Sequence, residues 1–275
     1  MTGTRVLTAL VLIPVVVAIV LFTPTWAVAI ATAIITVLAL WEYFALGEAI
    51  GHRAYRLWTT FSSLLFILSQ SVITRSFIDP PHVFYLAGLN FFLFILGITC
   101  LTLWTHRPLV ESLPAAGISS SALLLVAFPL SFAVCLHGVE DGRLLLLFAL
   151  AITWAADTTA YFVGRAIGKH PLAPHISPKK TWEGSIAGMF GSLLVAYAFS
   201  YWIKIPLPHL LVMAVFGNIA GQMGDLLESA YKRSAGVKDS GGLLPGHGGI
   251  LDRIDALILC IPVIWYYLVL VNPSL

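Results

Sequence analysis

Charged residues are scarce in this sequence. Asp, Glu, Lys and Arg make up only 10% of its 275 residues, whereas soluble proteins carry roughly 25%. Hydrophobic residues make up 59%, so a soluble domain of this size would lack the polar side chains to cover its surface. The composition therefore excludes a soluble globular protein and indicates an integral membrane protein. The formal net charge of +2 says little about partners, and no nucleic acid is expected.

Cysteine is also rare and is never paired. Cys100, Cys135 and Cys260 lie singly in apolar runs, whereas disulfide frameworks and cysteine metal sites need defined spacings. We interpret all three as small apolar residues. The sequence also lacks an internal repeat, a low-complexity tract and any segment long enough to fold as a soluble domain.

Long apolar runs dominate instead. A membrane-spanning helix needs about 20 mostly apolar residues. Nine candidate segments are Val6–Phe22, Trp26–Leu46, Leu57–Ile73, Val83–Leu103, Ile118–Leu136, Leu144–Gly164, Gly184–Ile203, Pro208–Leu227 and Ile254–Val271. We interpret the first as an uncleaved anchor rather than a signal sequence, because its run is long and the second follows after a short turn. The predicted fold is an all-α, polytopic transmembrane helical bundle of about nine spans.

Lys and Arg fall mostly on one side of this nine-span arrangement. Twelve share the side of the N-terminus, and three (Arg75, Arg143 and Lys204) lie on the other side. Because Lys and Arg concentrate in cytoplasmic loops, the N-terminus is predicted in the cytoplasm and the C-terminus outside. The expected location is an inner membrane of the bacterial type, with the active site facing the cytoplasm.

Chemically informative side chains are confined to the second half of the chain. Residues 1–142 predict five spans that serve as a lipid-facing scaffold. Residues 143–275 predict a catalytic half of four spans with two long cytoplasmic loops, 165–183 and 228–253. Seven of the 13 acids lie in or beside these loops: Asp157, Glu183, Asp225, Glu228, Asp239, Asp252 and Asp255. Acids at membrane depth are costly and are candidate functional residues by default.

Two of these acids predict a metal site. Asp225 lies at the end of the eighth predicted span and Asp252 at the start of the ninth. Mg²⁺ usually binds one or two carboxylates plus substrate phosphates, so both are predicted as its ligands, with Mn²⁺ as a substitute. Three acids are expected nearby: Asp157, Glu228 and Asp255. The alternative is a solvated helix end at Asp225 and an acid that favours the helix dipole at Asp252.

A glycine-rich segment joins the last two spans. Five glycines and a proline lie between Gly241 and Gly249, which excludes a helix and lets the backbone approach a ligand. Successive N–H groups in such turns bind phosphate oxygens. Substrate contacts are therefore predicted for Gly246, His247, Gly248 and Gly249. His247 is expected to be a hydrogen-bonding residue rather than a metal ligand.

The connection between the sixth and seventh spans is also basic. Ser177 followed by Pro178 fits a helix start, and helix N-termini beside lysines attract anions. Substrate contacts are predicted for Arg165, Ser177, Lys179, Lys180 and Thr181, the alternative being that the lysines serve orientation alone. The stretch from Gly164 to Lys169 does not fit a Walker loop, because the spacing between its glycines is one residue short.

Small residues and one outlying acid complete the pattern. Gly184 with Gly188, and Gly217 with Gly221, predict close helix packing. We expect this packing within the bundle, while a homodimer stays open. Glu42 lies near the end of the second predicted span, where snorkelling to the interface explains it as well as function does.

Over residues 155–256 the sequence resembles the phosphatidate cytidylyltransferases (CDP-diacylglycerol synthases). The matching residues are Asp157, Tyr161, Gly164-Arg165, Ser177 to Gly184, Gly224-Asp225, Ser229, Lys232-Arg233, Lys238-Asp239, Pro245 to Gly249, Asp252-Arg253 and Asp255. Tyr231 departs from the family pattern, in which an aliphatic residue or Phe is usual. The first five spans match in hydropathy only.

The resemblance implies that phosphatidic acid attacks the α-phosphorus of CTP and that pyrophosphate leaves. It assigns Lys232, Arg233, Lys238 and Arg253 to the phosphates of both substrates, and Ser229 and Asp239 to substrate binding. Two alternatives are a CTP-dependent lipid kinase, such as dolichol or phytol kinase, and a membrane transporter. The complete Pro-Gly-His-Gly-Gly-x-x-Asp-Arg run argues against the kinase, and the confinement of charges to one half argues against the transporter.

Overall fold

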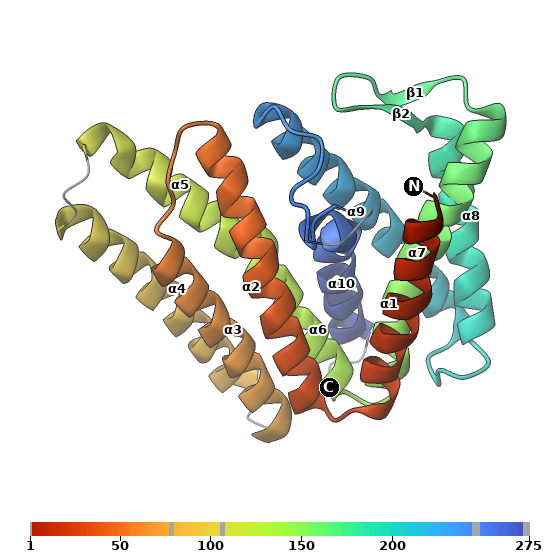
Figure 1. Cartoon of the computed structure of the whole chain (residues 1–275). Helices are drawn as coiled ribbons and strands as arrows, with labels where there is room; N and C mark the ends of the chain where they lie inside the picture. Colours follow the sequence, from red (N-terminus) through yellow and green to blue (C-terminus); the bar gives the residue numbers. More distant parts are fainter. Residues whose placement is uncertain (1, 77–79, 105–107, 244–247, 272–275) are drawn as a thin grey trace.

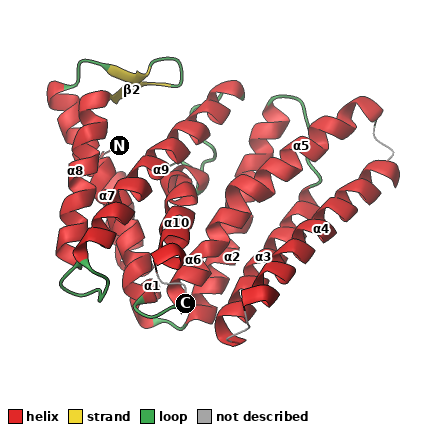
Figure 2. Ribbon diagram, turned by 180° about the vertical axis from the view of Figure 1, so that it is seen from behind, coloured by secondary structure: helices red, strands yellow, loops and turns green. Residues whose placement is uncertain are grey.

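The computed structural model describes residues 2–76, 80–104, 108–243 and 248–271, and helices dominate them (Figures 1 and 2). The helices are α1 (Thr2–Phe22), α2 (Thr25–Ala49), α3 (Arg56–Ser76), α4 (Pro80–Trp104), α5 (Ser112–Ala122), α6 (Phe128–Gly138), α7 (Gly142–Ile167), α8 (Trp182–Phe199), α9 (Leu207–Ser234) and α10 (Leu251–Val271). A short 3-10 turn, η1 (Leu109–Glu111), precedes α5. Strands β1 (Pro171–Ala173) and β2 (Ser177–Thr181) form an antiparallel hairpin between α7 and α8.

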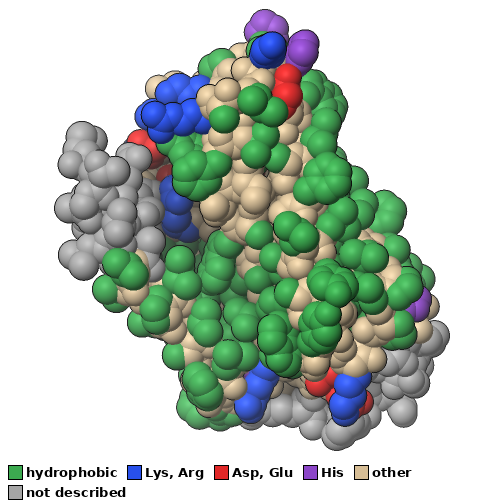
Figure 3. Space-filling view, turned by 90° about the vertical axis from the view of Figure 1, so that its right-hand side faces the viewer, with side chains coloured by type: hydrophobic (Ala, Val, Ile, Leu, Met, Phe, Trp, Pro, Cys, Tyr) green, Lys and Arg blue, Asp and Glu red, His purple; other side chains and the backbone are tan. Residues whose placement is uncertain are grey.

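Several helices have the length and composition of membrane spans. Among the described residues, six helical runs qualify: Thr25–Ala49, Leu86–Trp104, Leu109–Gly138, Gly142–Ile167, Leu207–Ser234 and Leu251–Val271. On the face in Figure 3, charged side chains gather mainly near the two ends, and a broad hydrophobic surface lies between them. These observations confirm an all-α polytopic membrane protein, apart from the small hairpin. The count of nine spans and the sides of the termini stay predictions.

The fifth predicted span is a continuous but irregular helix. Between α5 and α6 lies a π-helical turn, η2 (Leu123–Ala127). Pro129 follows it, and proline lacks an N–H and crowds the carbonyl four residues earlier. That carbonyl belongs to Leu125, inside the wider π turn, which accommodates such crowding. The chain therefore stays helical to Gly138.

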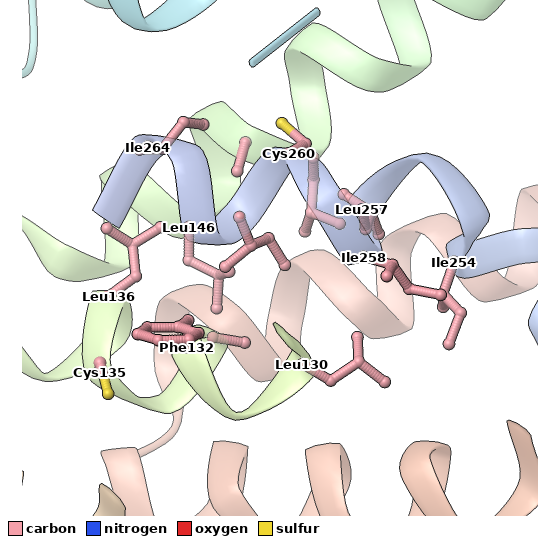
Figure 4. Packing of buried hydrophobic residues seen from close by; sticks show 14 of the residues in the cluster. Leu130, Phe132, Cys135, Leu136, Leu146, Ile254, Leu257, Ile258, Cys260 and Ile264 are labelled. Atoms are coloured by element: carbon pink, nitrogen blue, oxygen red, sulfur yellow. The ribbon is translucent and has the colours of Figure 1, made fainter. Parts of the chain in front are cut away.

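One hydrophobic core joins the two halves of the chain. α6 packs against α2, α3, α7 and α10, while α1 packs against α7. Figure 4 shows the residues that meet in this core, among them Leu130, Phe132 and Leu136 of α6, Leu146 of α7, and Ile254, Leu257, Ile258 and Ile264 of α10. The predicted scaffold and catalytic halves therefore share an interior.

Glycines let α7 and α8 approach closely. A Cβ at Gly184 would lie 2.8 Å from the carbonyl oxygen of Ala160, and one at Gly188 would lie 3.1 Å from that of Ala156. A Cβ at Gly221 of α9 would lie 3.4 Å from the carbonyl oxygen of Ala256 in α10, which is an ordinary van der Waals contact. The predicted close packing within the bundle is confirmed, and the homodimer stays a prediction.

The predicted helix start at Ser177 and Pro178 is wrong. Both residues lie in β2, where Ser177 pairs with Ala173. α8 begins at Trp182, and the Thr181 hydroxyl accepts a hydrogen bond from the Gly184 N–H at 3.2 Å. The fixed φ of proline suits an extended edge strand as well as the first turn of a helix, so the Ser-Pro pair alone could not decide between them.

Candidate active site

A cavity of about 290 Å³ opens between α7, the hairpin, α8 and α9. Its walls are formed by Ala156, Asp157, Ala160, Tyr161, Leu172, Lys179, Lys180, Thr181, Gly184, Ser185, Gly188, Gly221, Gln222 and Asp225. The long helices supply the acids and β2 supplies the lysines. The cavity therefore brings both signs of charge together inside a largely apolar bundle. We refer to it as the α7–α9 cavity.

Three carboxylates from three helices are electrostatically coupled beside this cavity. Asp157 of α7, Asp225 of α9 and Asp255 of α10 lie near enough to repel one another. Lys180 forms an ion pair with Asp225, and Arg253 attracts Asp157. The surrounding cations thus offset part of the repulsion. We call Asp157, Asp225 and Asp255 the carboxylate cluster.

A second charged group is buried between α9 and α10. The ammonium of Lys232 pairs with Glu228 and lies 2.5 Å from Asp252 Oδ1. The side chains of Lys232, Glu228 and Asp252 are only 11%, 5% and 6% exposed. Charges held out of water need partners, and here one ammonium serves two carboxylates. Lys232, which was predicted to bind substrate phosphates, therefore bridges the two helices.

Asp252 also organises the glycine-rich segment. Its Oδ2 accepts hydrogen bonds from the N–H groups of Ser240 (2.9 Å) and Gly249 (2.8 Å). Gly248 has φ +80°, and a Cβ there would lie 2.7 Å from the same oxygen, so both backbone and space require glycine. These N–H groups bind a protein carboxylate, and a phosphate role for Gly248 and Gly249 stays a prediction. Pro245, Gly246 and His247 lie outside the described residues.

Glu42 of α2 reaches the same segment. Its carboxylate accepts hydrogen bonds from the N–H groups of Ile250 (2.9 Å) and Leu251 (2.8 Å) and from the Ser240 hydroxyl (3.0 Å). From the sequence alone, snorkelling to the interface explains Glu42 as well as function does. The only sequence signal for this role is an acid near the end of an apolar span. The sequence does not identify its partner, because Leu251 lies 209 positions further along the chain.

The remaining predicted polar residues lie around these groups. Arg233 Nε donates to the carbonyl of Ile176 at 3.3 Å, which joins α9 to the hairpin turn. Arg165 donates to the hydroxyl of Tyr161 at 3.2 Å. The hydroxyl of Ser229 lies 3.5 Å from Asp225 Oδ1. Lys179, Lys238, Asp239 and Arg253 are exposed, as are Arg165 and Arg233.

Comparison with known proteins shows to which family a chain with this arrangement of lysines and acids belongs. The sequence matches the profile described as the Cytidylyltransferase family over residues 3–271. The chain belongs to this cytidylyltransferase family. The match extends beyond residues 155–256, which carry the recognisable motifs, and includes α1 to α6.

Curated relatives of this cytidylyltransferase include bacterial proteins named phosphatidate cytidylyltransferase. The Haemophilus influenzae protein is 34% identical over 284 aligned positions, which cover 96% of this chain and 97% of that protein. The Bacillus subtilis protein is 37% identical over 176 positions, covering 62% and 65%. The Staphylococcus aureus (strain COL) protein is 46% identical over 127 positions, covering 46% and 49%.

The acids of this cytidylyltransferase could offer oxygen ligands to a metal ion, but in the structure they form ion pairs with lysines. Within the part of the chain that the structure describes, no three His, Cys, Asp or Glu side chains form a group arranged for a metal ion. Asp225 pairs with Lys180, and Asp252 pairs with Lys232. The two predicted ligands therefore lie in neighbouring charged groups, and the Asp255 carboxylate lies between them, where both Asp225 and Glu228 repel it.

Proposed function

We propose that this cytidylyltransferase acts on phosphatidic acid, transferring the cytidylyl group of CTP to it and releasing pyrophosphate. The product is CDP-diacylglycerol, an intermediate of phospholipid biosynthesis. The observation that carries the proposal is the α7–α9 cavity, where lysines and acids meet in a chain of this family. The H. influenzae relative, similar over almost its full length, bears the name of this activity.

The reaction brings two polyanions together. A phosphatidate oxygen forms a bond to the α-phosphorus of CTP, and the bond to the departing pyrophosphate breaks. Positive charge must offset both the initial repulsion and the charge that develops on the leaving group. Lys179 and Lys180 line the cavity, and Arg253 lies near Asp157. We assign these three residues, with Arg233 and Lys238, to the phosphates.

Lys180 has two competing partners in this account. In the protein alone its ammonium pairs with Asp225. A triphosphate oxygen offers a stronger concentration of negative charge, so CTP would draw Lys180 away from the acid. Substrate binding would then release the Asp225 carboxylate for a divalent cation.

Mg²⁺ suits the acids that surround the site. Carboxylate oxygens, phosphates and water are its preferred ligands, and the mutual repulsion of the carboxylate cluster favours a cation. Asp225 and Asp252 are assigned as ligands, with Mn²⁺ as a substitute. Residues expected around them are Asp157, Glu228 and Asp255. When bound, the ion would neutralise charge on the phosphates of CTP.

The cellular location follows from the two substrates. Phosphatidic acid resides in the bilayer, and CTP is available in the cytoplasm. We therefore place the protein in a bacterial-type inner membrane, with the hairpin and the glycine-rich segment on the cytoplasmic side. Further substrate contacts are assigned to Arg165, Ser177, Thr181, Ser229, Asp239 and residues 246–249. Assembly as a homodimer stays a prediction.

The position of a radioactive label tests the reaction. Purified protein in mixed micelles with phosphatidic acid and Mg²⁺ receives CTP labelled either in the cytidine or in the γ-phosphate. We expect the cytidine label to enter the lipid and the γ-phosphate label to be released in water-soluble pyrophosphate. EDTA should abolish both the labelling of lipid and the release of pyrophosphate. Transfer of the γ-phosphate to lipid, or no transfer of cytidine label, would contradict the proposal.

A further inference from the structure

The Glu42 carboxylate occupies the N-terminus of α10 from another helix. The first N–H groups of any helix lack partners within that helix, and the helix dipole favours negative charge at this end. Here Glu42 accepts from the N–H groups of Ile250 and Leu251, at 2.9 and 2.8 Å. An acid of α2 thus accepts hydrogen bonds from the N–H groups at the start of α10, although the two helices are distant in sequence.

Two glycines of the glycine-rich segment make room for this acid. A Cβ at Gly241 would lie 2.6 Å from Glu42 Oε1, and one at Gly249 would lie 2.3 Å from Oε2. Both distances are well below normal contact, so any other residue would push the carboxylate away. The composition of this segment therefore reflects the presence of Glu42, and not only an approach to phosphate.

A single hydroxyl links Glu42 to Asp252. Ser240 Oγ lies 3.0 Å from Glu42 Oε2 and 3.0 Å from Asp252 Oδ2. A serine hydroxyl has one proton to donate, so the two carboxylates share it or alternate as its acceptor. The position of Asp252 therefore depends on where Glu42 lies.

The next residue on α2 fixes this turn of the helix. The ring of Tyr43 packs edge-on against that of Tyr231 of α9, with centroids 5.8 Å apart. Its hydroxyl donates to Ser121 of α5 at 2.9 Å. The backbone that carries Glu42 is thus held between two neighbouring helices, which gives the carboxylate a defined position.

We propose that Glu42 is a positioning residue of the active site. It anchors the start of α10 and the Ser240 hydroxyl, and through them it orients Asp252 for cytidylyl transfer. If Asp252 turned toward a bound cation, Ser240 would donate to Glu42 and the glycine-rich segment would keep its anchor. α2 then belongs to the catalytic apparatus, in addition to the scaffold role predicted for residues 1–142. The role given to Asp252 rests on the proposed function.

The test compares kinetic parameters across a matched set of variants. Glu42→Gln keeps the size but turns an amide toward N–H groups, whereas Glu42→Asp keeps the charge. Glu48→Gln is the control, because Glu48 lies on the same helix but pairs with Arg56. For Glu42→Gln we expect kcat/KM for CTP to fall about tenfold or more, the KM for phosphatidic acid to stay within about twofold, and Glu42→Asp to recover part of the loss.

A double-variant cycle separates positioning from general stability. Ser240→Ala should also lower kcat/KM for CTP, and the loss in the double variant should be smaller than the product of the two single losses, because both changes remove the hydrogen bond between Ser240 and Glu42. Losses that multiply in the double variant would overturn the proposal, as would a Glu42→Gln variant that matches Glu48→Gln. Should Glu42→Gln fail to fold, Ser240→Ala decides alone, and wild-type kinetics there would overturn the proposal. If the wild type itself made no CDP-diacylglycerol, the proposed function would fail instead.

Discussion

At the scale of single residues, the two lysines that hold the predicted metal ligands differ in their surroundings. Lys180 lines the α7–α9 cavity and is 28% exposed, whereas Lys232 is 11% exposed between two acids. A lysine at the wall of a cavity can change partners when a phosphate arrives. A lysine buried between Glu228 and Asp252 loses two ion pairs if it moves. We therefore expect Lys180 to act in substrate binding and Lys232 to contribute mainly to the fold.

The substitution Lys232→Met tests this contrast. It would leave Glu228 and Asp252 buried without their cation, a change that typically costs about 3–5 kcal/mol of stability. We predict a large fall in the thermal unfolding midpoint of the purified protein in detergent. Lys180→Met should leave the midpoint near that of the wild type but raise the KM for CTP. The opposite assignment of the two effects would refute this division of roles.

At the scale of helices, the site depends on backbones that touch. A Cβ at Gly224 of α9 would lie 2.4 Å from the carbonyl oxygen of Asp255 in α10. This contact lies next to Asp225 in sequence, so it sets the separation of two members of the carboxylate cluster. The precision of the acids therefore comes from helix packing, which flexible loops could not provide.

Gly224→Ala should disturb both stability and turnover. Overpacking of this kind costs about 1–3 kcal/mol, and pushing α9 from α10 would displace Asp225. Gly117→Ala in α5 is the matched control, because no atom lies within 4 Å of its Cβ position. We predict lower turnover and a lower unfolding midpoint for Gly224→Ala and near-normal values for Gly117→Ala, measured by the lipid-labelling assay and by thermal unfolding. Equal behaviour of the two variants would show that this contact is unimportant.

The sequence predicted these helices well because each apolar run is long enough to cross the bilayer as a helix. All but one of the predicted spans lie within helical runs, and the seventh continues past the end of α8 at Phe199. The hairpin was missed because Ser177 to Thr181 shows no apolar alternation. Contacts such as Glu42 with Ser240 were missed for a different reason: periodicity describes one helix at a time and does not identify its partners. The acids and lysines of the site were found, but their pairing required the packed structure.

At the scale of the whole molecule, polar contacts connect loops at one end of the bundle. Lys204, after α8, pairs with Glu140, before α7, at 2.9 Å. Arg143 donates to the carbonyl of Leu21 near the end of α1 at 3.1 Å. In the nine-span arrangement these residues all lie in loops or at span ends on the side opposite the N-terminus. The packing is thus compatible with the alternation on which the charge count relies.

Labelling of single cysteines tests the orientation. In a cysteine-free background, His175→Cys in the hairpin turn and Asp239→Cys should react with impermeant maleimide only after the membrane is opened. Lys204→Cys should react in intact cells, because positive-inside bias places residues 200–206 outside. A reactive His175→Cys in intact cells would reverse the predicted orientation, although it would leave the chemistry of the cavity unaffected.

We propose that acids of α9 and α10 support metal-dependent transfer of the cytidylyl group to phosphatidic acid. The most direct test of this proposal is kcat for Asp225→Asn and Asp252→Asn, with Asp141→Asn as a control at the other end of the bundle. Because a metal held by these acids would stabilise charge that develops in the transition state, we predict about a hundredfold or greater loss of kcat in both site variants. Raised Mg²⁺ or Mn²⁺ should recover part of it, while the control stays near wild type. Near-wild-type kcat in both folded site variants would contradict the account.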